Sequence, residues 1–231
     1  MAISEAVKRI NERIGEACLR AGRRPSEVRL MAVSKFHTLP EIEEAWQAGI
    51  RLFGENRVQE AAAKFADFRA RHPGAELHLI GSLQRNKAKT AAAFFDLIQS
   101  VDREALIEEL GTAAARRSEP LQVLLELHTG EDSKAGFPDT DSLCRAAERL
   151  LSCPALIPAG LMTMAPFTGD EGRIRASFRA LRAAAERLSA RFPEACWSCL
   201  SMGMSNDFEI AIEEGSTLVR IGTALFGERH T

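Results

Sequence analysis

The chain alternates short apolar runs with longer helical stretches from one end to the other. Eight runs have the length and composition of β-strands: 28–34, 50–54, 76–81, 95–100, 121–127, 155–162, 196–201 and 216–222. The stretches between them are rich in alanine, leucine and charged residues, with apolar residues three or four apart, as in amphipathic helices. Strands that alternate with helices pair in parallel. We therefore expect a parallel sheet with both faces covered.

Eight strand–helix units indicate a closed (β/α)8 barrel of the TIM type, although 231 residues lie near the short end for that fold. An open, doubly wound sheet is the alternative. It is the weaker one because no glycine-rich G-x-G-x-x-G motif follows the first strand. No proline- or serine-rich linker divides the chain, so we interpret residues 1–231 as a single barrel domain.

The composition restricts the classes of partner. Hydrophobic residues make up 45% and charged residues 27%, close to globular averages, and the formal net charge is −2. A near-neutral balance favours neither nucleic acid nor an anionic membrane. No apolar stretch has the length of a membrane span, and the first residues lack the apolar core of a signal peptide. We expect a cytoplasmic protein that binds neither nucleic acid nor membrane.

The cysteines predict neither a disulfide framework nor a metal centre. They are five in number and scattered, and an odd set of this kind argues against paired disulfides. Cys196 and Cys199 form a C-x-x-C pair within a predicted strand. Side chains three apart on a strand face opposite sides, and no second pair completes a zinc site. We expect no metal.

The ends of the first and last strands carry the residues best suited to chemistry. In TIM-type barrels the functional residues lie at the carboxyl ends of the strands. Lys35 follows the first strand, where its ordinary fate is a solvated surface lysine, but a desolvated lysine attacks carbonyl groups. Gly222 permits close backbone approach, Thr223 offers a hydroxyl, and a helix starting after Thr223 would favour a phosphate. Arg220 precedes them, with a surface ion pair as its ordinary alternative. The spacing alone does not name the ligand.

Six segments together resemble the pyridoxal phosphate homeostasis protein family. They follow the family order over nearly the whole chain: MAVSK (31–35), FGENRVQEAAAK (53–64), LHLIGSLQRNKAK (77–89), EDSKAGF (131–137), GLMTMAP (160–166) and LSMGMSNDFEIAIEEGSTLVRIGTALFG (200–227). The last segment is long and highly specific. The resemblance implies a fold type III barrel, similar to the N-terminal domain of alanine racemase, with pyridoxal 5′-phosphate as cofactor.

The resemblance also implies roles for particular residues. Lys35 would hold the cofactor as a Schiff base, with Asn56 beside it. Arg220 would approach the pyridine nitrogen, where it cannot accept a proton and so weakens the ring as an electron sink. The positions that match the family's phosphate contacts are Ser201, Gly222 and Thr223.

Several polar residues keep an open interpretation. For His78, in the H-x-I-G motif, two interpretations have equal weight: a core histidine bonded to the backbone, and a functional histidine. His128 stands where an asparagine-containing stretch is common in the family, and we interpret it as a solvated loop histidine. After Lys35, Phe36 and His37 also depart from the family pattern, which leaves the contacts of this loop open. A polar and basic cluster is interpreted as a solvated helix start in preference to an anion or partner site: Gln84, Arg85, Asn86, Lys87 and Lys89.

Two classes of function remain, a cofactor carrier and an enzyme. A racemase of the related fold uses a lysine on one face of the cofactor and a tyrosine on the other, and the tyrosine comes from a separate C-terminal β domain. This chain contains no tyrosine, so proton transfer on the second face would need another acid–base residue. We expect a carrier acting in vitamin B6 homeostasis, with no catalytic residues, and keep a racemase-like enzyme acting on amino acids as the alternative. A cofactor-sensing regulator is a third possibility. We expect a monomer with transient contacts to proteins that receive the cofactor.

Overall fold

A computed structural model describes residues 2–131 and 135–227. In this part of the chain, eight parallel strands pair in sequence order and close into a barrel: β1 (Arg29–Val33), β2 (Leu52–Glu55), β3 (Glu76–Leu79), β4 (Leu97–Val101), β5 (Leu121–Glu126), β6 (Leu156–Met162), β7 (Cys199–Ser201) and β8 (Leu218–Ile221). The predicted (β/α)8 barrel is confirmed, and the open sheet is excluded because β8 pairs with β1.

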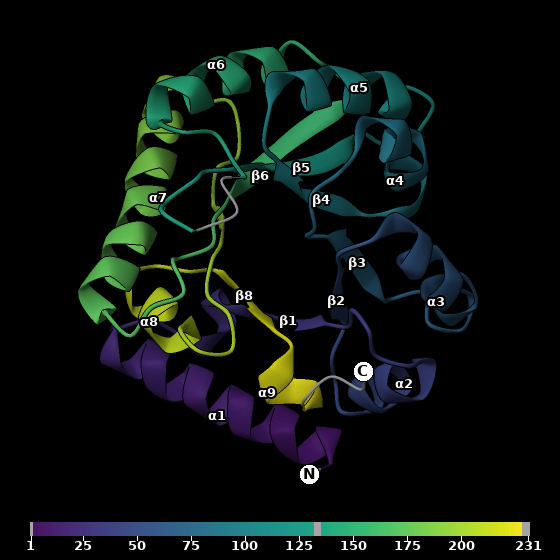
Figure 1. Ribbon diagram of the computed structural model, residues 1–231, viewed down its shortest axis with the longest axis vertical. Helices are drawn as coiled ribbons and strands as arrows, with labels where there is room; N and C mark the ends of the chain where they lie inside the picture. Colours follow the sequence, from purple (N-terminus) through teal and green to yellow (C-terminus); the bar gives the residue numbers. More distant parts are fainter. Residues whose placement is uncertain (1, 132–134, 228–231) are drawn as a thin grey trace.

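Helices surround the barrel on the outside (Figure 1). They are α1 (Ile3–Arg20), α2 (Leu39–Gln47), α3 (Val58–Arg71), α4 (Ala88–Phe94), α5 (Glu104–Ala114), α6 (Thr140–Leu151), α7 (Glu171–Arg191), α8 (Phe208–Glu213) and α9 (Thr223–Phe226), with short 3-10 turns η1 (Pro25–Glu27) and η2 (Arg85–Lys87). Strands such as β2 and β4 are buried at every residue, because one face meets the barrel interior and the other meets the helices. Within residues 2–131 and 135–227, no helix has the length and apolar character of a membrane span.

The seventh strand is shorter than predicted. The run 196–201 was expected to be a strand, but β7 begins only at Cys199 and Cys196 is exposed before it. Trp197 explains the apolar signal, because its buried ring packs 6.5 Å from the ring of Phe192 at the end of α7. Cys199 instead packs among apolar side chains inside the barrel. Among the residues that the structure describes, no group of three or more His, Cys, Asp or Glu side chains could hold a metal ion.

The order of the strands brings three chain segments together at the barrel mouth. β1 lies between β8 and β2, with Ala32 in register with both Ile221 and Phe53. The residues that follow these three strands therefore emerge side by side. Lys35 comes two residues after β1, Asn56 directly follows β2, and Gly222 directly follows β8.

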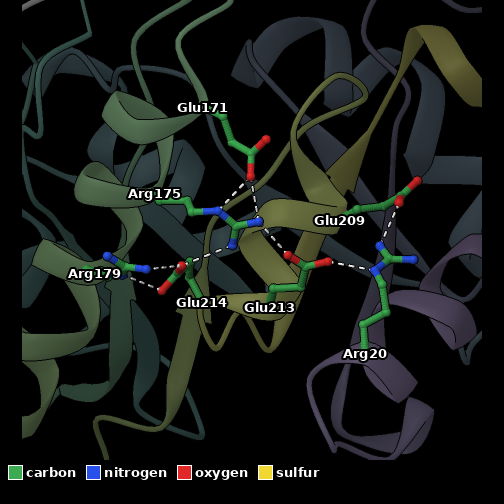
Figure 2. Close-up of polar contacts among 7 residues, drawn as sticks. All are labelled: Arg20, Glu171, Arg175, Arg179, Glu209, Glu213 and Glu214. Atoms are coloured by element: carbon green, nitrogen blue, oxygen red, sulfur yellow. Dashed lines mark hydrogen bonds and ion pairs between the residues drawn. The ribbon is translucent and has the colours of Figure 1, made fainter.

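A network of ion pairs joins α1, α7 and α8 on the outside of the barrel (Figure 2). Glu213 of α8 is its centre, accepting from Arg20 of α1 at 2.7 Å and from Arg175 of α7 at 2.6 Å. The other members are Glu171, Arg179, Glu209 and Glu214. Because α8 follows the loop after β7, the network fixes the helix that supports one wall of the barrel mouth.

Candidate functional site

A cavity of about 270 Å³ lies at the carboxyl ends of the strands. It is lined by residues that come from all around the barrel mouth and that include most of those singled out in the sequence: Lys35, Asn56, Arg220, Gly222 and Thr223, with Val33, Ile80, Met162, Met164, Phe167, Met204, Ser205 and Asn206. Small-molecule sites begin at roughly 300 Å³. The cavity therefore suits a compact ligand that meets one arginine, one lysine and several apolar walls.

Lys35 is half-buried in a loop that is held from both sides. The next residue, Phe36, has φ 66°, a left-handed conformation that is uncommon for a residue with a side chain. The Phe36 N–H donates to Glu60 Oε1 at 2.7 Å, and Lys64 Nζ donates to the carbonyl of Ser34 at 2.8 Å. Both partners belong to α3, so this helix fixes the backbone immediately before and after Lys35.

Beneath this loop lies a buried ion pair that the sequence analysis missed. Glu55 is fully buried at the end of β2, and its Oε1 accepts from Lys64 Nζ at 2.6 Å and from Ser34 Oγ at 2.7 Å. Burial raises the pKa of Glu55 above its ordinary value, even though Lys64 and Ser34 act against that shift. Its Oε2 has no hydrogen-bond partner among the described residues. A carboxylate within the apolar run that ends β2 is the sequence signal that could have revealed it.

Asn56 offers an unsatisfied polar atom to the cavity. The side chain is half-buried, and the structure gives its buried Oδ1 no hydrogen-bond partner within residues 2–131 and 135–227. Gly81, which follows β3, packs tightly on the same segment, because a Cβ there would lie 2.3 Å from the Asn56 carbonyl oxygen. A buried amide group without a partner is costly. A ligand in the cavity that pairs with this amide would remove that cost.

Arg220 is buried on β8 and is held by oxygen atoms from two neighbouring strand ends. Its Nη1 donates to the Ser201 carbonyl at 2.7 Å and to Ser201 Oγ at 2.6 Å, and its Nη2 donates to the Thr163 carbonyl at 2.8 Å. Burial lowers the pKa of Arg220 to about 10, so the guanidinium remains charged at neutral pH. The surface ion pair considered as its ordinary alternative is therefore wrong.

Ser201 lies deeper than the sequence analysis expected. It is fully buried, and its hydroxyl accepts from Arg220 and donates to Gln99 Oε1 at 2.6 Å, a placement at odds with direct contact to a phosphate. Ser205, later in the same polar turn, lines the cavity instead, and its Oγ accepts from the Ala224 N–H at 3.3 Å. α9 begins at Thr223, and the first N–H groups of a helix lack partners within it. Ser205 and the start of α9 thus form the polar side of the cavity.

The structure places His78, His128 and the cluster at residues 84–89. His78 is buried like a core histidine, but its partners are side chains and not the backbone, with Nε2 at 2.7 Å from Glu76 Oε1 and Nδ1 at 2.9 Å from Gln99 Nε2. His128 is half-buried with a buried Nδ1, so it is not a solvated loop histidine. Residues 84–89 form η2 and the start of α4 and are mostly exposed, which confirms the solvated helix start. The middle of the 131–137 segment, residues 132–134, lies outside the described residues.

The charges and shape of the cavity define what it can hold. Its lining combines a cationic Arg220, the Lys35 side chain, and Ser205 and Thr223 beside the start of α9, while Met162 supplies an apolar wall. A small anionic molecule with a flat apolar body and a carbonyl group fits this set of partners. The fold and the site together define a ligand-binding (β/α)8 barrel with its lysine at the mouth.

Comparison with known proteins specifies the class. The model of the family described as "Alanine racemase, N-terminal domain" matches residues 8–230. A protein of Vibrio cholerae named pyridoxal phosphate homeostasis protein is 41% identical over 231 residues, which cover 99% of this chain and 97% of that protein. An Escherichia coli protein of the same name is 38% identical over 231 residues, covering 98% of this chain and 97% of that protein. The chain belongs to the pyridoxal phosphate homeostasis protein family, as the sequence segments predicted.

Solved structures agree with this assignment. PipY of Synechococcus elongatus, solved with pyridoxal phosphate bound, is 40% identical and superimposes with a TM-score of 0.82. The match covers 94% of this chain and 100% of PipY. Alanine racemase of Bacillus anthracis has a TM-score of 0.70 at 17% identity, covering 99% of this chain but 57% of the racemase. The likeness to the racemase shows the barrel fold alone.

Proposed function

We propose that this protein binds pyridoxal 5′-phosphate on Lys35 and holds it reversibly, as a carrier in the cell's supply of that cofactor. The convergence of Lys35, Arg220 and Thr223 on one small cavity is the observation that carries the proposal. When bound, the cofactor would supply an aldehyde group with which the Lys35 amine could form a Schiff base, releasing one water. The names of the curated relatives and the pyridoxal phosphate bound to PipY support this function.

Each polar group of the cavity has a role in this proposal. Lys35 supplies the amine, and the clamp from Glu60 and Lys64 presents it toward the cavity. Arg220 would face the pyridine nitrogen and, because a guanidinium cannot accept a proton, would keep the ring uncharged. The phosphate would be held by Gly222 and Thr223 at the start of α9 and by Ser205 beside them, all three of which line the cavity.

The same geometry gives two further residues supporting roles. Asn56 lines the cavity, and its buried Oδ1, which has no hydrogen-bond partner among the described residues, would accept from a donor group of the bound cofactor. Ser201 acts one step away, because its carbonyl and hydroxyl oxygens hold the Arg220 guanidinium. We therefore place Ser201 among the residues that position the site and Ser205 among those that touch the phosphate.

One observation favours a catalytic alternative. Glu126 ends β5 in register with Met162, which lines the cavity, and burial raises the pKa of Glu126 to about 7. A buried carboxyl group that titrates near neutral pH is suited to general acid–base catalysis. A racemase-like enzyme would use it on the face of the cofactor that lacks a tyrosine. The carrier is preferred because Arg220 beside the ring nitrogen gives little support to carbanion chemistry.

The carrier and the enzyme differ in what happens at the α-carbon of an amino acid. Cofactor-loaded protein is incubated in deuterated water with a panel of amino acids, and deuterium at the α-carbon is measured by mass spectrometry. A carrier exchanges no faster than free pyridoxal phosphate. Exchange that disappears in both Lys35→Ala and Glu126→Gln would establish the enzyme and remove the carrier.

Binding itself is tested with matched lysine variants. Wild type, Lys35→Ala and Lys89→Ala are incubated with pyridoxal phosphate and desalted, and the visible absorbance that remains is recorded. Lys89 is exposed on α4, so its variant controls for reaction of surface lysines. Wild type and Lys89→Ala should stay yellow while Lys35→Ala becomes colourless. A colourless wild type would remove the proposal.

The proposal extends to the setting in which the carrier works. We propose a cytoplasmic monomer that contacts cofactor-requiring enzymes only transiently. Light scattering coupled to gel filtration should give the mass of one chain, 25.3 kDa. Loaded protein mixed with an apo-enzyme that needs pyridoxal phosphate should restore its activity, and a stable complex between the two would contradict the transient contact.

A further inference from the structure

A continuous line of hydrogen-bonded side chains crosses the interior of the barrel and ends at Arg220. It begins at the amino ends of β1 and β3, where Arg29 pairs with Glu76. From Glu76 it passes to His78 at 2.7 Å, to Gln99 of β4 at 2.9 Å, to Ser201 of β7 at 2.6 Å and to Arg220 of β8 at 2.6 Å. His78, Gln99 and Ser201 are buried. The line therefore connects the closed end of the barrel with the cavity at its mouth.

The upper links of this line have a single possible direction. A guanidinium can only donate, so Ser201 Oγ accepts from Arg220 Nη1. The hydroxyl proton of Ser201 is then given to Gln99 Oε1. Because the amide oxygen of Gln99 faces Ser201, its amide nitrogen faces His78 and donates to Nδ1. Arg220 therefore donates to the Ser201 hydroxyl oxygen, and the proton of that hydroxyl is donated to Gln99.

The hydrogen bonds below Gln99 continue in the same direction. His78 Nδ1 accepts from Gln99, so the imidazole carries its proton on Nε2 and donates it to Glu76 Oε1. Burial also lowers the pKa of His78, which keeps the ring neutral. Glu76 is ionised, because hydrogen bonds from His78 and Arg29 outweigh its burial and lower its pKa to about 2. Because Arg220 at one end can only donate and ionised Glu76 at the other can only accept, the donor and acceptor of every link between them are fixed.

We propose that His78 and Gln99 are positioning residues that act through Ser201 to fix the guanidinium of Arg220 against the ring of the bound cofactor. The inference rests on the proposed function, in which Arg220 faces the pyridine nitrogen. Neither His78 nor Gln99 lines the cavity. Their effect is transmitted by the Ser201 hydroxyl, the one side-chain acceptor that holds the guanidinium together with the Ser201 and Thr163 carbonyls. Buried networks of this kind orient their members because every polar group depends on its neighbour.

Gln99→Met breaks the line at its centre with little change in side-chain length. His78→Asn breaks only the lower link, because its amide oxygen can still accept from Gln99. Ser100→Ala is the matched control: Ser100 is the next residue on β4, is buried, and donates to the Gly81 carbonyl at 2.7 Å without belonging to the line. Ser201→Ala removes the last link directly and serves if Gln99→Met does not fold.

Two properties of cofactor-loaded protein are measured, its visible absorption maximum and the rate of cofactor release to an excess of apo-enzyme. We expect Gln99→Met and Ser201→Ala to shift the maximum and to release the cofactor about tenfold faster, which corresponds to about 1.4 kcal/mol. His78→Asn should release it at a rate between those of wild type and Gln99→Met. Ser100→Ala should match wild type in both properties, even if it unfolds at a lower urea concentration.

The inference is overturned if Gln99→Met or Ser201→Ala gives the wild-type spectrum and the wild-type release rate. A purely structural role for the line would lower the unfolding midpoint without moving either property. Failure of the proposed function looks different, because wild-type protein would then acquire no chromophore that depends on Lys35. If wild type acquires the cofactor and the variants behave like wild type, the positioning role is rejected while the proposed function stands.

Discussion

Replacement of Lys64 by methionine should destabilise the protein in a way that depends on pH. Lys64 contacts Glu55 at 2.6 Å, Glu60 at 2.9 Å and the Ser34 carbonyl at 2.8 Å. Without it, Glu55 becomes a buried carboxylate whose remaining partner is Ser34. Removing one partner of a buried ion pair costs about 3–5 kcal/mol. Glu55 can limit the loss by taking up a proton, which at pH 7 costs about 3.7 kcal/mol for a carboxyl of ordinary pKa.

The sign of the pH dependence follows from this protonation. In Lys64→Met the folded-state pKa of Glu55 lies even further above its unfolded value than in wild type, where burial already raises it. The folded variant therefore binds more protons than the unfolded chain, and its stability falls as pH rises from the unfolded pKa toward the folded one. Near neutral pH the deficit relative to wild type should grow by about 1.4 kcal/mol per pH unit. Below pH 5 it should largely disappear.

Urea unfolding followed by circular dichroism, at pH 5 to 8 and without cofactor, measures this deficit. The double variant Lys64→Met with Glu55→Gln is the control, because it removes the charge that Lys64 compensates. It should be more stable than Lys64→Met at pH 7.5 and should have lost the added pH dependence. A Lys64→Met protein within about 1 kcal/mol of wild type at pH 7.5, or one with the wild-type slope, would refute the role assigned to this pair.

Three other changes test separate parts of the structure. Gly81→Ala places a methyl group against the Asn56 backbone, so it should cost about 1–3 kcal/mol of stability and weaken cofactor binding in an absorbance titration; unchanged binding would contradict the packing of Gly81 on Asn56. Arg175→Met removes the arginine that joins α7 to Glu213, so it should lower the free energy of unfolding by about 1 kcal/mol, and less in 1 M salt, where ion pairs are screened. A thiol reagent should modify the exposed Cys196 faster than the half-buried Cys199, since burial raises the pKa of Cys199 to about 11; equally rapid modification of both would contradict the placement of Cys199.

Much of the fold and of the cavity could be predicted because both depend on the order of strands along the chain. The apolar runs located the strands, and residues that follow strands of a parallel barrel meet at one end. Lys35 and Thr223 were found in this way and Asn56 from the family resemblance, and all three line the cavity. The run 196–201 misled because Trp197 is apolar for a different reason, its packing over the end of α7.

The interior line could not be predicted, because strands buried on both faces show no alternation of apolar and polar residues. Nothing in the runs around His78 and Gln99 tells which side chains point into the barrel and which toward the helices. Ser201 was assigned to the phosphate from the family resemblance, which does not tell that its side chain is buried inside the barrel. A polar residue inside an apolar run is the useful signal, since Glu55 and Gln99 both stand out in this way and both proved to be buried and hydrogen-bonded.

Covalent trapping tests the central proposal most directly. Wild-type protein loaded with pyridoxal phosphate is reduced with borohydride, digested, and searched for modified lysines by mass spectrometry. We expect one modified residue, Lys35, at close to one cofactor per chain. Lys64 is the informative competitor, because it also lies near the cavity loop and hydrogen-bonds to Ser34. Modification of Lys64, or a scatter of modified surface lysines with Lys35 unlabelled, would contradict the proposal.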